Sequence, residues 1–273
     1  MVPNIFDINI TDISHIDTHE VKCLLCQRRD IASVNSFVIN GQKFNTVRCL
    51  HDGMMWLDPQ PSQSFYDYIY SKRYHNTGIE DPLYEQATLD VFDDPVALQN
   101  VAEMRMNDIE RFAAKGRFLE VGFGAGYTLK EAQRRGWETY GIETEERCIR
   151  EIQGSGINAI KGDFLDQNEA EKYDVIAMYS VIEHILDPET FLRKASSLLR
   201  KNGLLVLRLP DTGVQGPTAS LIAHVFHFNA HTVLVFLRHC GFEPICIDGF
   251  GLWKPRKYPG GLWNMNVYSK RTD

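Results

Sequence analysis

From residue 116 onward, short apolar runs alternate with longer amphipathic stretches along the chain. Runs of this length are typical of strands buried on both faces, and amphipathic stretches are typical of the helices that cover them. The alternation therefore predicts an α/β fold, with a parallel sheet and helices on both of its faces. The expected strands lie within 118–121, 139–143, 158–164, 173–181 and 204–210, and the expected helices within 129–135, 148–152 and 188–200.

A different pattern precedes this region. Residues 21–75 hold short β-like runs, SFVI, KFNTVRC and GMMWL, which predict a small β module. Residues 76–115 predict a helical connector and cap, because their apolar positions recur at near-helical spacing. Residues 1–20 are polar, and we expect them to be loosely held. The expected organisation is thus an N-terminal segment, a β module, a connector and a main domain over 116–273.

Length and composition are those of an ordinary globular protein of 273 residues. The net charge is −7 and no long run of Lys and Arg occurs, so we expect neither nucleic acid nor an anionic membrane as a partner. No apolar segment is long enough to span a bilayer, and the N-terminus lacks the pattern of a signal peptide. With no export signal, the six cysteines are expected to be reduced thiols in a cytoplasmic protein.

The stretch FLEVGFGAGY, residues 118–127, is a candidate ligand-binding loop. Its three glycines, Gly122, Gly124 and Gly126, let the backbone turn tightly and approach a ligand before a helix begins. The spacing is G-x-G-x-G, whereas the dinucleotide fingerprint is G-x-G-x-x-G, and Tyr127 stands where its third glycine would be. The loop therefore favours an adenosyl ligand without a pyrophosphate over NAD or FAD.

Several segments, in a fixed order, resemble the class I S-adenosylmethionine (SAM)-dependent methyltransferases. They are LEVGFGAG, the acidic end of YGIE, the triplet Gly-Asp-Phe after the third strand, YDVIAMYSVIEHILDP, and HVFHFNAHTVLVFLRHCGFE. The resemblance implies a Rossmann-like, doubly wound, mostly parallel seven-stranded sheet. It also implies SAM as the cofactor and an in-line transfer of its methyl group to a nucleophile.

The resemblance implies a role for each matched residue. Main-chain N–H groups of the glycine loop would approach the carboxylate and ribose of SAM, and Glu120 would lie near its ammonium or sulfonium. Glu143 would accept both ribose hydroxyls, and Asp163 the adenine amino group, with Phe164 packed beside the base. Considered alone, Glu143 is also compatible with a solvated charge at a helix start, and Asp163 with a turn residue.

Three tyrosines are further candidates for the cofactor site. Tyr179 ends the fourth strand, at the edge where ligands bind in such sheets. Tyr70 and Tyr74 resemble a tyrosine-rich element that closes over the cofactor in related enzymes, where an aromatic face would attract a sulfonium. The alternative for this pair is an aromatic contact that holds the β module against the main domain.

Histidines are the candidate catalytic bases. A hydroxyl or carbon acceptor needs a base near it, and histidine is the side chain best suited to this near neutral pH. His184 follows the fourth strand, while His224, His227 and His231 cluster in the segment expected to cover the mouth of the site. We favour His227 first and His184 second. The alternative is that these histidines only hold the strand and the covering segment in place.

The β module carries a candidate metal site. Cys23-Leu-Leu-Cys26 and Cys49-Leu-His51-Asp52 resemble the two knuckles of a zinc ribbon that some bacterial methyltransferases carry. A structural zinc site needs four ligands, and only three thiolates are present. Either His51 or Asp52 would complete it, and His51 is the more usual donor. The alternative is a ribbon that folds without metal.

The sequence thus predicts a SAM-dependent methyltransferase with a small-molecule acceptor and a structural Zn²⁺ ion. By resemblance, the acceptor would be an O-, N- or C-nucleophile, such as a sugar or a secondary-metabolite intermediate. Two alternatives stay open. One is a non-catalytic partner that uses the ribbon for protein interaction. The other is a nucleotide-dependent oxidoreductase, against which the glycine spacing counts.

Overall fold

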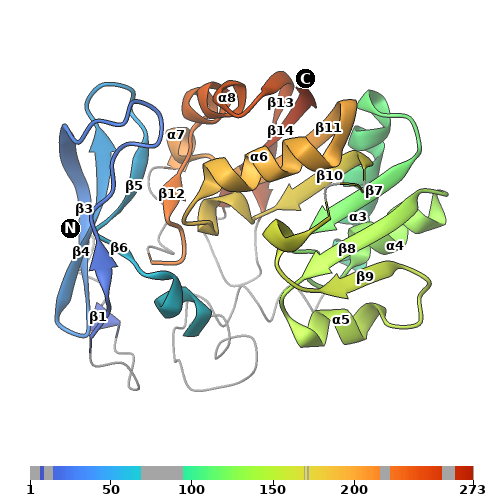
Figure 1. Cartoon of the computed structure of the whole chain (residues 1–273), viewed down its shortest axis with the longest axis horizontal. Coiled ribbons are helices and arrows are strands. Elements are labelled where there is room, and N and C mark those ends of the chain that lie inside the picture. The colour runs from blue at the N-terminus through green and yellow to red at the C-terminus, as the bar shows by residue number, and fades with distance from the viewer. Residues whose placement is uncertain are drawn as a thin grey trace.

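Two large sheets share one hydrophobic core in the computed structural model of the chain (Figure 1). The structure describes residues 7–8, 15–68, 95–168, 170, 172–215, 222–253 and 262–272. The strands are β1 (Asp7–Ile8), β2 (Thr18–His19), β3 (Ile31–Ile39), β4 (Gln42–Cys49), β5 (Met55–Asp58), β6 (Gln60–Pro61), β7 (Arg117–Val121), β8 (Glu138–Glu143), β9 (Asn158–Lys161), β10 (Tyr173–Tyr179), β11 (Leu199–Pro210), β12 (Phe226–His227), β13 (Phe242–Trp253) and β14 (Leu262–Arg271). The helices are α3 (Pro95–Phe112), α4 (Tyr127–Arg134), α5 (Glu146–Ile152), α6 (Pro188–Leu198), α7 (Thr212–Gln215) and α8 (Ala230–His239), with 3₁₀ turns η1 (Phe164–Asp166) and η2 (Ile182–His184).

The larger sheet has seven strands in the order β13-β14-β11-β10-β7-β8-β9. Five neighbouring strands, from β9 to β11, run parallel, while β14 runs antiparallel to both β11 and β13. The predicted Rossmann-like, doubly wound and mostly parallel sheet is confirmed.

Side chains of the central strand β10 show why this region has continuous apolar runs. Ile176 and Met178 belong to a core cluster that includes residues of α6 and α8. Val175, Ala177 and Tyr179, which point to the opposite face, belong to a cluster that includes residues of α3, α4 and α5. Because helices cover both faces, the five successive residues from Val175 to Tyr179 are all buried.

Several of the expected boundaries differ from the structure by a few residues, and two of them have a clear local cause. The strand expected over 158–164 ends at Lys161, because the Asp163 side chain accepts a hydrogen bond from the Leu165 N–H and so begins η1. The helix expected over 188–200 ends at Leu198, where the chain enters β11. Among the residues that the structure describes, no helix is long and apolar enough to cross a bilayer.

The second sheet, here called the N-terminal sheet, has the order β1-β3-β4-β5-β12. Its last strand, β12, comes from the chain between β11 and α8, and pairs Phe226 with Trp56 and His227 with Met55. The sequence pattern did not predict this pairing. The expectation that residues 1–20 are loosely held was also wrong at Ile16, which is buried. Its main-chain N–H donates to the side-chain amide oxygen of Gln42, and its carbonyl accepts from the side-chain amide nitrogen of the same residue.

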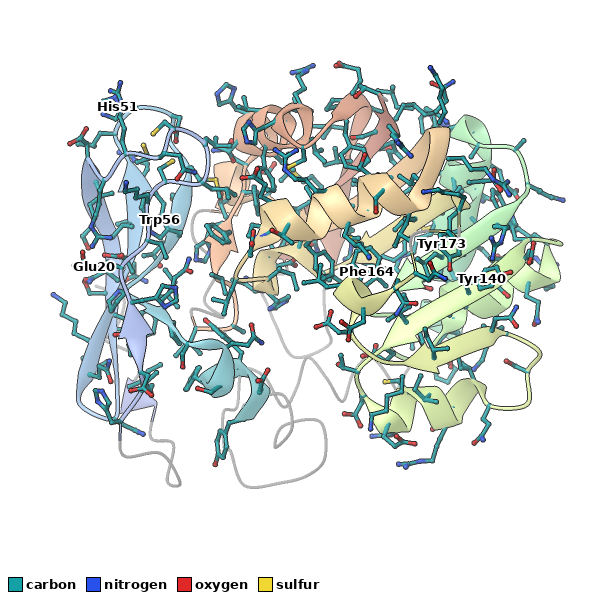
Figure 2. All side chains as sticks on the ribbon, viewed as in Figure 1. Glu20, His51, Trp56, Tyr140, Phe164 and Tyr173 are labelled. Carbon is teal, nitrogen blue, oxygen red and sulfur yellow. The ribbon has the colours of Figure 1, made fainter. Side chains whose placement is uncertain are left out.

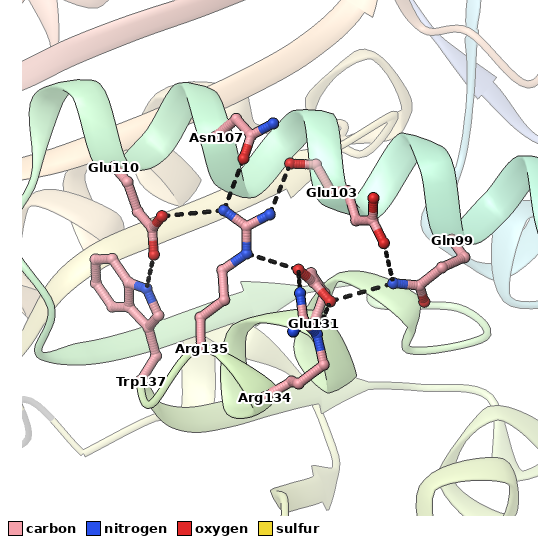
Figure 3. A network of polar contacts seen from close by, with 8 residues as sticks. All are labelled: Gln99, Glu103, Asn107, Glu110, Glu131, Arg134, Arg135 and Trp137. Carbon is pink, nitrogen blue, oxygen red and sulfur yellow. Dashed lines mark hydrogen bonds and ion pairs between the residues drawn. The ribbon is translucent and has the colours of Figure 1, made fainter.

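A buried carboxylate fastens α4 to its neighbours (Figure 3). The Glu131 side chain has an exposed fraction of 0 % and accepts hydrogen bonds from Arg134, Arg135 and Gln99 at 2.6–3.1 Å. The Arg134 contact is the largest cause of a pKa for Glu131 that is lowered from 4.5 to about 2. The carboxylate therefore stabilises the fold in its charged form.

Replacing Glu131 with Gln is expected to lower the free energy of unfolding at pH 7 by about 2–3 kcal/mol. Because the folded-state pKa is depressed, this contribution is complete above about pH 4.5 and fades as the pH falls toward about 2. Urea unfolding of both proteins at pH 7 and pH 3 would measure it. The difference should shrink at the lower pH, and a constant difference would contradict the role of the charge. Glu243→Gln, at an exposed ion pair, is the control and should change stability little.

Candidate functional site

The predicted glycine loop and three of the other predicted cofactor residues lie where parallel strands end. The glycine loop follows β7, Glu143 ends β8, Asp163 follows β9 and Tyr179 ends β10. These strands are neighbours and parallel, so their carboxyl ends meet at one edge of the sheet, where ligands bind in open α/β folds. The adjoining loops are joined by backbone hydrogen bonds from Gly122 N–H to Ile142 and from Gly162 N–H to Glu143.

The glycine loop and Glu143 are in direct contact. The Gly124 N–H donates to Glu143 Oε2 at 3.0 Å, and the Thr144 N–H donates to Oε1 at 2.8 Å. Gly124 has a φ of +55°, and a Cβ added there would meet no atom within 4 Å. Gly126, at φ +72°, is different, since an added Cβ would lie 2.5 Å from the Ile152 side chain. The loop therefore leaves open space above Gly124, beside a carboxylate and the N-terminus of α4.

Behind the loop lies a buried polar group around Glu120. Glu120 is 2 % exposed, and among the described residues its Oε2 has no hydrogen-bond partner. Burial raises the pKa of this carboxyl to about 8, although the nearby Arg105 acts in the opposite direction. The Arg105 guanidinium lies 3.7 Å from the centre of the Tyr179 ring and donates to Thr128 Oγ1 at 2.9 Å. A cofactor end that carries both an ammonium and a carboxylate matches Glu120 and Arg105 chemically.

Arg105 was missed by the sequence analysis. Its position in the sequence could have pointed to the site. Ala102, Met106 and Ile109 form the buried face of α3, and Arg105 lies three residues after Ala102 and four before Ile109, so it belongs to the same face. A charged residue on the buried face of a helix needs a partner, and the Arg105 guanidinium contacts the Thr128 hydroxyl and the face of the Tyr179 ring. The residue that follows the tyrosine, Ser180, has a φ of 56°, an uncommon conformation for a residue other than glycine.

The side chains of Asp163 and Phe164 both contact neighbouring parts of the protein. Asp163 is exposed and caps η1, as the turn interpretation expected. Phe164, labelled in Figure 2, is 3 % exposed. Its ring packs against that of Phe191 of α6 at a centroid distance of 4.7 Å. The proposed contacts of this pair with adenine stay predictions. Tyr70 and Tyr74 lie outside the described residues.

The structure brings both candidate bases together with a third histidine. The ring centroids of His184 and His224 lie 4.7 Å apart, and those of His224 and His227 lie 6.2 Å apart. His227 is 2 % exposed, and neither of its ring nitrogens has a hydrogen-bond partner within the described part of the chain. Burial lowers the pKa of His184 and of His227 to about 4, so both imidazoles are neutral at pH 7. His231 does not join them and is exposed on α8.

Three cysteines and an aspartate of the N-terminal sheet form a second cluster. One ligand atom from each of Cys23, Cys26, Cys49 and Asp52 lies within 4.8 Å of all the others. The two turns have the same form, because the Gln27 N–H donates to the Cys23 carbonyl and the Gly53 N–H to the Cys49 carbonyl. Asp52 therefore stands three residues after Cys49, just as Cys26 stands three residues after Cys23. Its Oδ2 lies 3.2 Å from Cys23 Sγ.

His51, which was the favoured fourth ligand, is not part of this cluster. Its Nε2 lies 2.6 Å from a carboxylate oxygen of Asp30, and its ring also contacts Arg28. Figure 2 shows His51 at one end of the N-terminal sheet. The reason is the register of the turn, which directs position 52 toward the thiols and position 51 away from them.

A glycine loop joined to an acidic strand end, on a seven-stranded sheet with this strand order, is typical of the class I SAM-dependent methyltransferase fold. Residues 97–247 match the family described as Methyltransferase domain, and the chain belongs to that family. The prediction of a methyltransferase fold is thus confirmed, and the family is not one of nucleotide-dependent oxidoreductases.

Relatives of known name agree with this assignment. The ubiquinone biosynthesis O-methyltransferase of Leptothrix cholodnii is 26% identical over 140 residues, which are 47% of this chain and 58% of that protein. The protein of the same name from Acinetobacter baumannii is 26% identical over 118 residues, covering 39% of this chain and 50% of that protein. The chain therefore matches only about half the length of these relatives.

Solved structures share the fold. The 1,6-didemethyltoxoflavin-N1-methyltransferase of Burkholderia thailandensis, which holds 1,6-didemethyltoxoflavin and S-adenosylhomocysteine, has a TM-score of 0.59 at 15% identity, covering 90% of this chain and 100% of that one. A SAM-dependent methyltransferase from Archaeoglobus fulgidus has a TM-score of 0.53 at 14% identity, covering 75% and 99%.

Proposed function

We propose that the chain transfers the methyl group of SAM to a small-molecule acceptor. The observation that carries the cofactor half of this proposal is the contact of Glu143 with the Gly124 N–H beside open space at the strand edge. Two findings support a small acceptor. The net charge of −7 disfavours a polyanionic substrate, and the relatives named above carry the names of small-molecule methyltransferases.

SAM supplies a methyl group on a sulfonium, which leaves readily as a thioether. The chain's residues have to hold that methyl group in line with an acceptor and exclude water from both. In this proposal Glu143 binds the ribose, Asp163 and Phe164 bind the adenine, and Glu120 with Arg105 binds the amino-acid end. His227, on the segment that joins the two sheets, lies nearest to the acceptor and receives its proton.

Glu143→Ala is expected to weaken binding of S-adenosylhomocysteine by about 1–3 kcal/mol, or roughly 5- to 150-fold in Kd. The variant loses two acceptor oxygens that the ribose hydroxyls would use. Isothermal titration measures the effect directly, and the ligand-induced rise in melting temperature should shrink with it. Glu151→Ala, on the exposed face of α5, is the matched control.

The same titration separates the proposal from its alternatives. NAD in place of S-adenosylhomocysteine should produce no thermal shift, and a shift with NAD alone would overturn the proposal. A non-catalytic partner would bind the cofactor normally but release no labelled product. Wild-type protein incubated with methyl-labelled SAM and pools of small hydroxyl, amine and carbon-acid compounds tests that outcome by mass spectrometry.

We infer a second, structural component for the N-terminal sheet, namely a Zn²⁺ ion held by Cys23, Cys26, Cys49 and Asp52. What supports it is the pairing of two alike turns whose four ligand atoms already converge. Burial raises the pKa of the Cys23 thiol, so without a cation this thiol stays protonated. A metal ion would stabilise the thiolates and clamp the two turns together.

Purified protein is expected to contain zinc at the cysteine cluster, and Asp52→Cys is expected to bind it more tightly than the wild type. Asp52→Ala should lose affinity at least roughly tenfold, because one of four ligands is gone. Competition with a chromogenic chelator measures both changes. His51→Ala is the control and should behave as the wild type. Equal affinities in all four proteins would exclude Asp52 as a ligand.

A further inference from the structure

Glu183, His184 and His224 form a cluster to which the proposed function assigns no role. A carboxylate oxygen of Glu183 and one ring nitrogen from each histidine all lie within 4.8 Å of one another. Glu183 is 2 % exposed and His224 is 9 % exposed, so two of the three groups are nine-tenths or more buried. None of them takes part in the cysteine cluster of the N-terminal sheet.

The orientation of His184 is fixed by the backbone. Its Nδ1 lies 2.7 Å from the carbonyl oxygen of Ala223, so Nδ1 carries the proton and donates it. In that tautomer Nε2 bears the lone pair, and this atom lies 3.9 Å from Glu183 Oε1. A second bond, from the Val225 N–H to the Glu183 carbonyl at 2.8 Å, fastens η2 to the same segment. Metal-binding histidines are held in this way, with the other ring N–H donated to a carbonyl.

Glu183 supplies the second, independent observation. Neither of its carboxylate oxygens has a hydrogen-bond partner among the described residues, although both are buried. Burial raises the pKa of this carboxyl to about 8. The charge of Arg208 lowers the pKa of Glu183, which opposes the effect of burial, but no ion pair joins the two within the described ranges. A buried carboxyl without a partner lowers stability, so it calls for a compensating group.

We propose that Glu183, His184 and His224 bind a first-row divalent transition-metal ion, Zn²⁺ or Fe²⁺, through one oxygen and two nitrogens. This donor set suits such ions and leaves coordination positions open for water or a substrate. Mg²⁺ and Ca²⁺ are poor candidates, because they favour oxygen donors. Around a bound ion with metal–ligand bonds near 2.0–2.1 Å, neighbouring ligand atoms would lie about 3–3.5 Å apart. The distance between His184 Nε2 and Glu183 Oε1 is 3.9 Å, so the side chains would move slightly closer on binding. The His184 side chain is 17 % exposed, against 2 % for that of Glu183, so the cluster is not wholly closed to solvent.

The site adjoins the cofactor edge. Val181, two residues before Glu183, lies so close to the glycine loop that a Cβ on Gly122 would be 2.9 Å from its side chain. The other wall is the segment that carries His227. An ion held between them would bind an oxygen or nitrogen of a small ligand next to the methyl donor. Metal binding itself is a property of these three residues and does not depend on the proposed function.

Equilibrium dialysis of the full chain against Zn²⁺, followed by metal analysis, tests the site. The cysteine cluster is present in every protein compared, so the comparison is between the wild type and Glu183→Gln or His224→Gln. Each variant is expected to hold one ion fewer per chain, or to bind that ion at least roughly tenfold more weakly. His231→Gln, which removes an exposed histidine nearby, should match the wild type.

Co²⁺ provides a second readout that separates the two clusters. Thiolate ligands give intense near-ultraviolet charge-transfer bands, whereas nitrogen and oxygen ligands give only weak visible bands. The two variants should lose visible intensity and keep any thiolate bands. Circular dichroism confirms that each variant is folded before it is compared. Metal content and Co²⁺ spectra equal to those of the wild type in both folded variants would overturn the site, whether or not methyl transfer is observed.

Discussion

Replacing His227 with Phe is expected to lower kcat for methyl transfer by about 10²–10⁴-fold, while the protein stays folded. The reason is that both ring nitrogens of His227 are buried without a partner in the described structure. A polar group in that state lowers stability, so its removal should be tolerated, whereas an acceptor bound nearby would lose its proton-accepting partner. Methyl transfer from labelled SAM, measured with the acceptor found in the compound pools, gives kcat.

Three further measurements separate a catalytic role from a structural one. The affinity for S-adenosylhomocysteine should stay unchanged, because the contacts of His227 in the described part of the chain are with Met55 and His224 and not with the glycine loop. The free energy of unfolding should change by no more than about 1–3 kcal/mol, the range for placing a slightly larger side chain in a packed core. His227→Gln should also be slow, since an amide does not accept a proton. If both variants kept the wild-type kcat, His227 would have a structural role only and no catalytic one.

Trp56→Ala is expected to reduce the free energy of unfolding by about 3–5 kcal/mol, which is the range for deleting a large buried aromatic side chain. Trp56 has an exposed fraction of 0 %, and it lies on β5 between Val47 of β4 and Phe226 of β12 (Figure 2). The cavity would therefore open where the N-terminal sheet meets the chain that leads to α8. Chemical denaturation followed by circular dichroism measures the loss.

Trp56→Phe is the matched control. Among the described residues the Trp56 Nε1 has no hydrogen-bond partner, so a smaller aromatic ring removes an unsatisfied donor and leaves a smaller cavity. We expect a much smaller loss than with Ala. Because one core cluster includes residues of both sheets, both variants should unfold in a single transition. Two separate transitions would show that the sheets unfold independently.

The strands of the large sheet could be predicted because burial on both faces leaves a local signature. The run YDVIAMY is apolar at nearly every position, and it forms β10 without interruption. The pattern predicted the end of β9 too late, because the apolar side chain of Phe164 continues the apolar pattern of the strand. The Asp163 carboxylate, a good cap, already begins a new turn there.

The features that the sequence did not predict are all set by distant partners. β12 is only two residues long, and its partner β5 lies far earlier in the chain, so no local periodicity marks it. Arg105 is assigned to the site only once α3 is packed beside Tyr179. At the cysteine cluster the sequence left His51 and Asp52 as alternatives and favoured His51 by donor type, and only the folded turns show that Asp52 lies beside the thiols.

The pairing of β12 with β5 bears on how this protein could be recombined with its relatives. An exchange of only the N-terminal residues would separate Trp56 from Phe226 and remove the partner of the strand that carries His227. A working chimera would need to take residues 222–228 from the same parent as the N-terminal sheet. Any natural transfer of that sheet between methyltransferases meets the same requirement, so it has to be inherited as two separate pieces of chain.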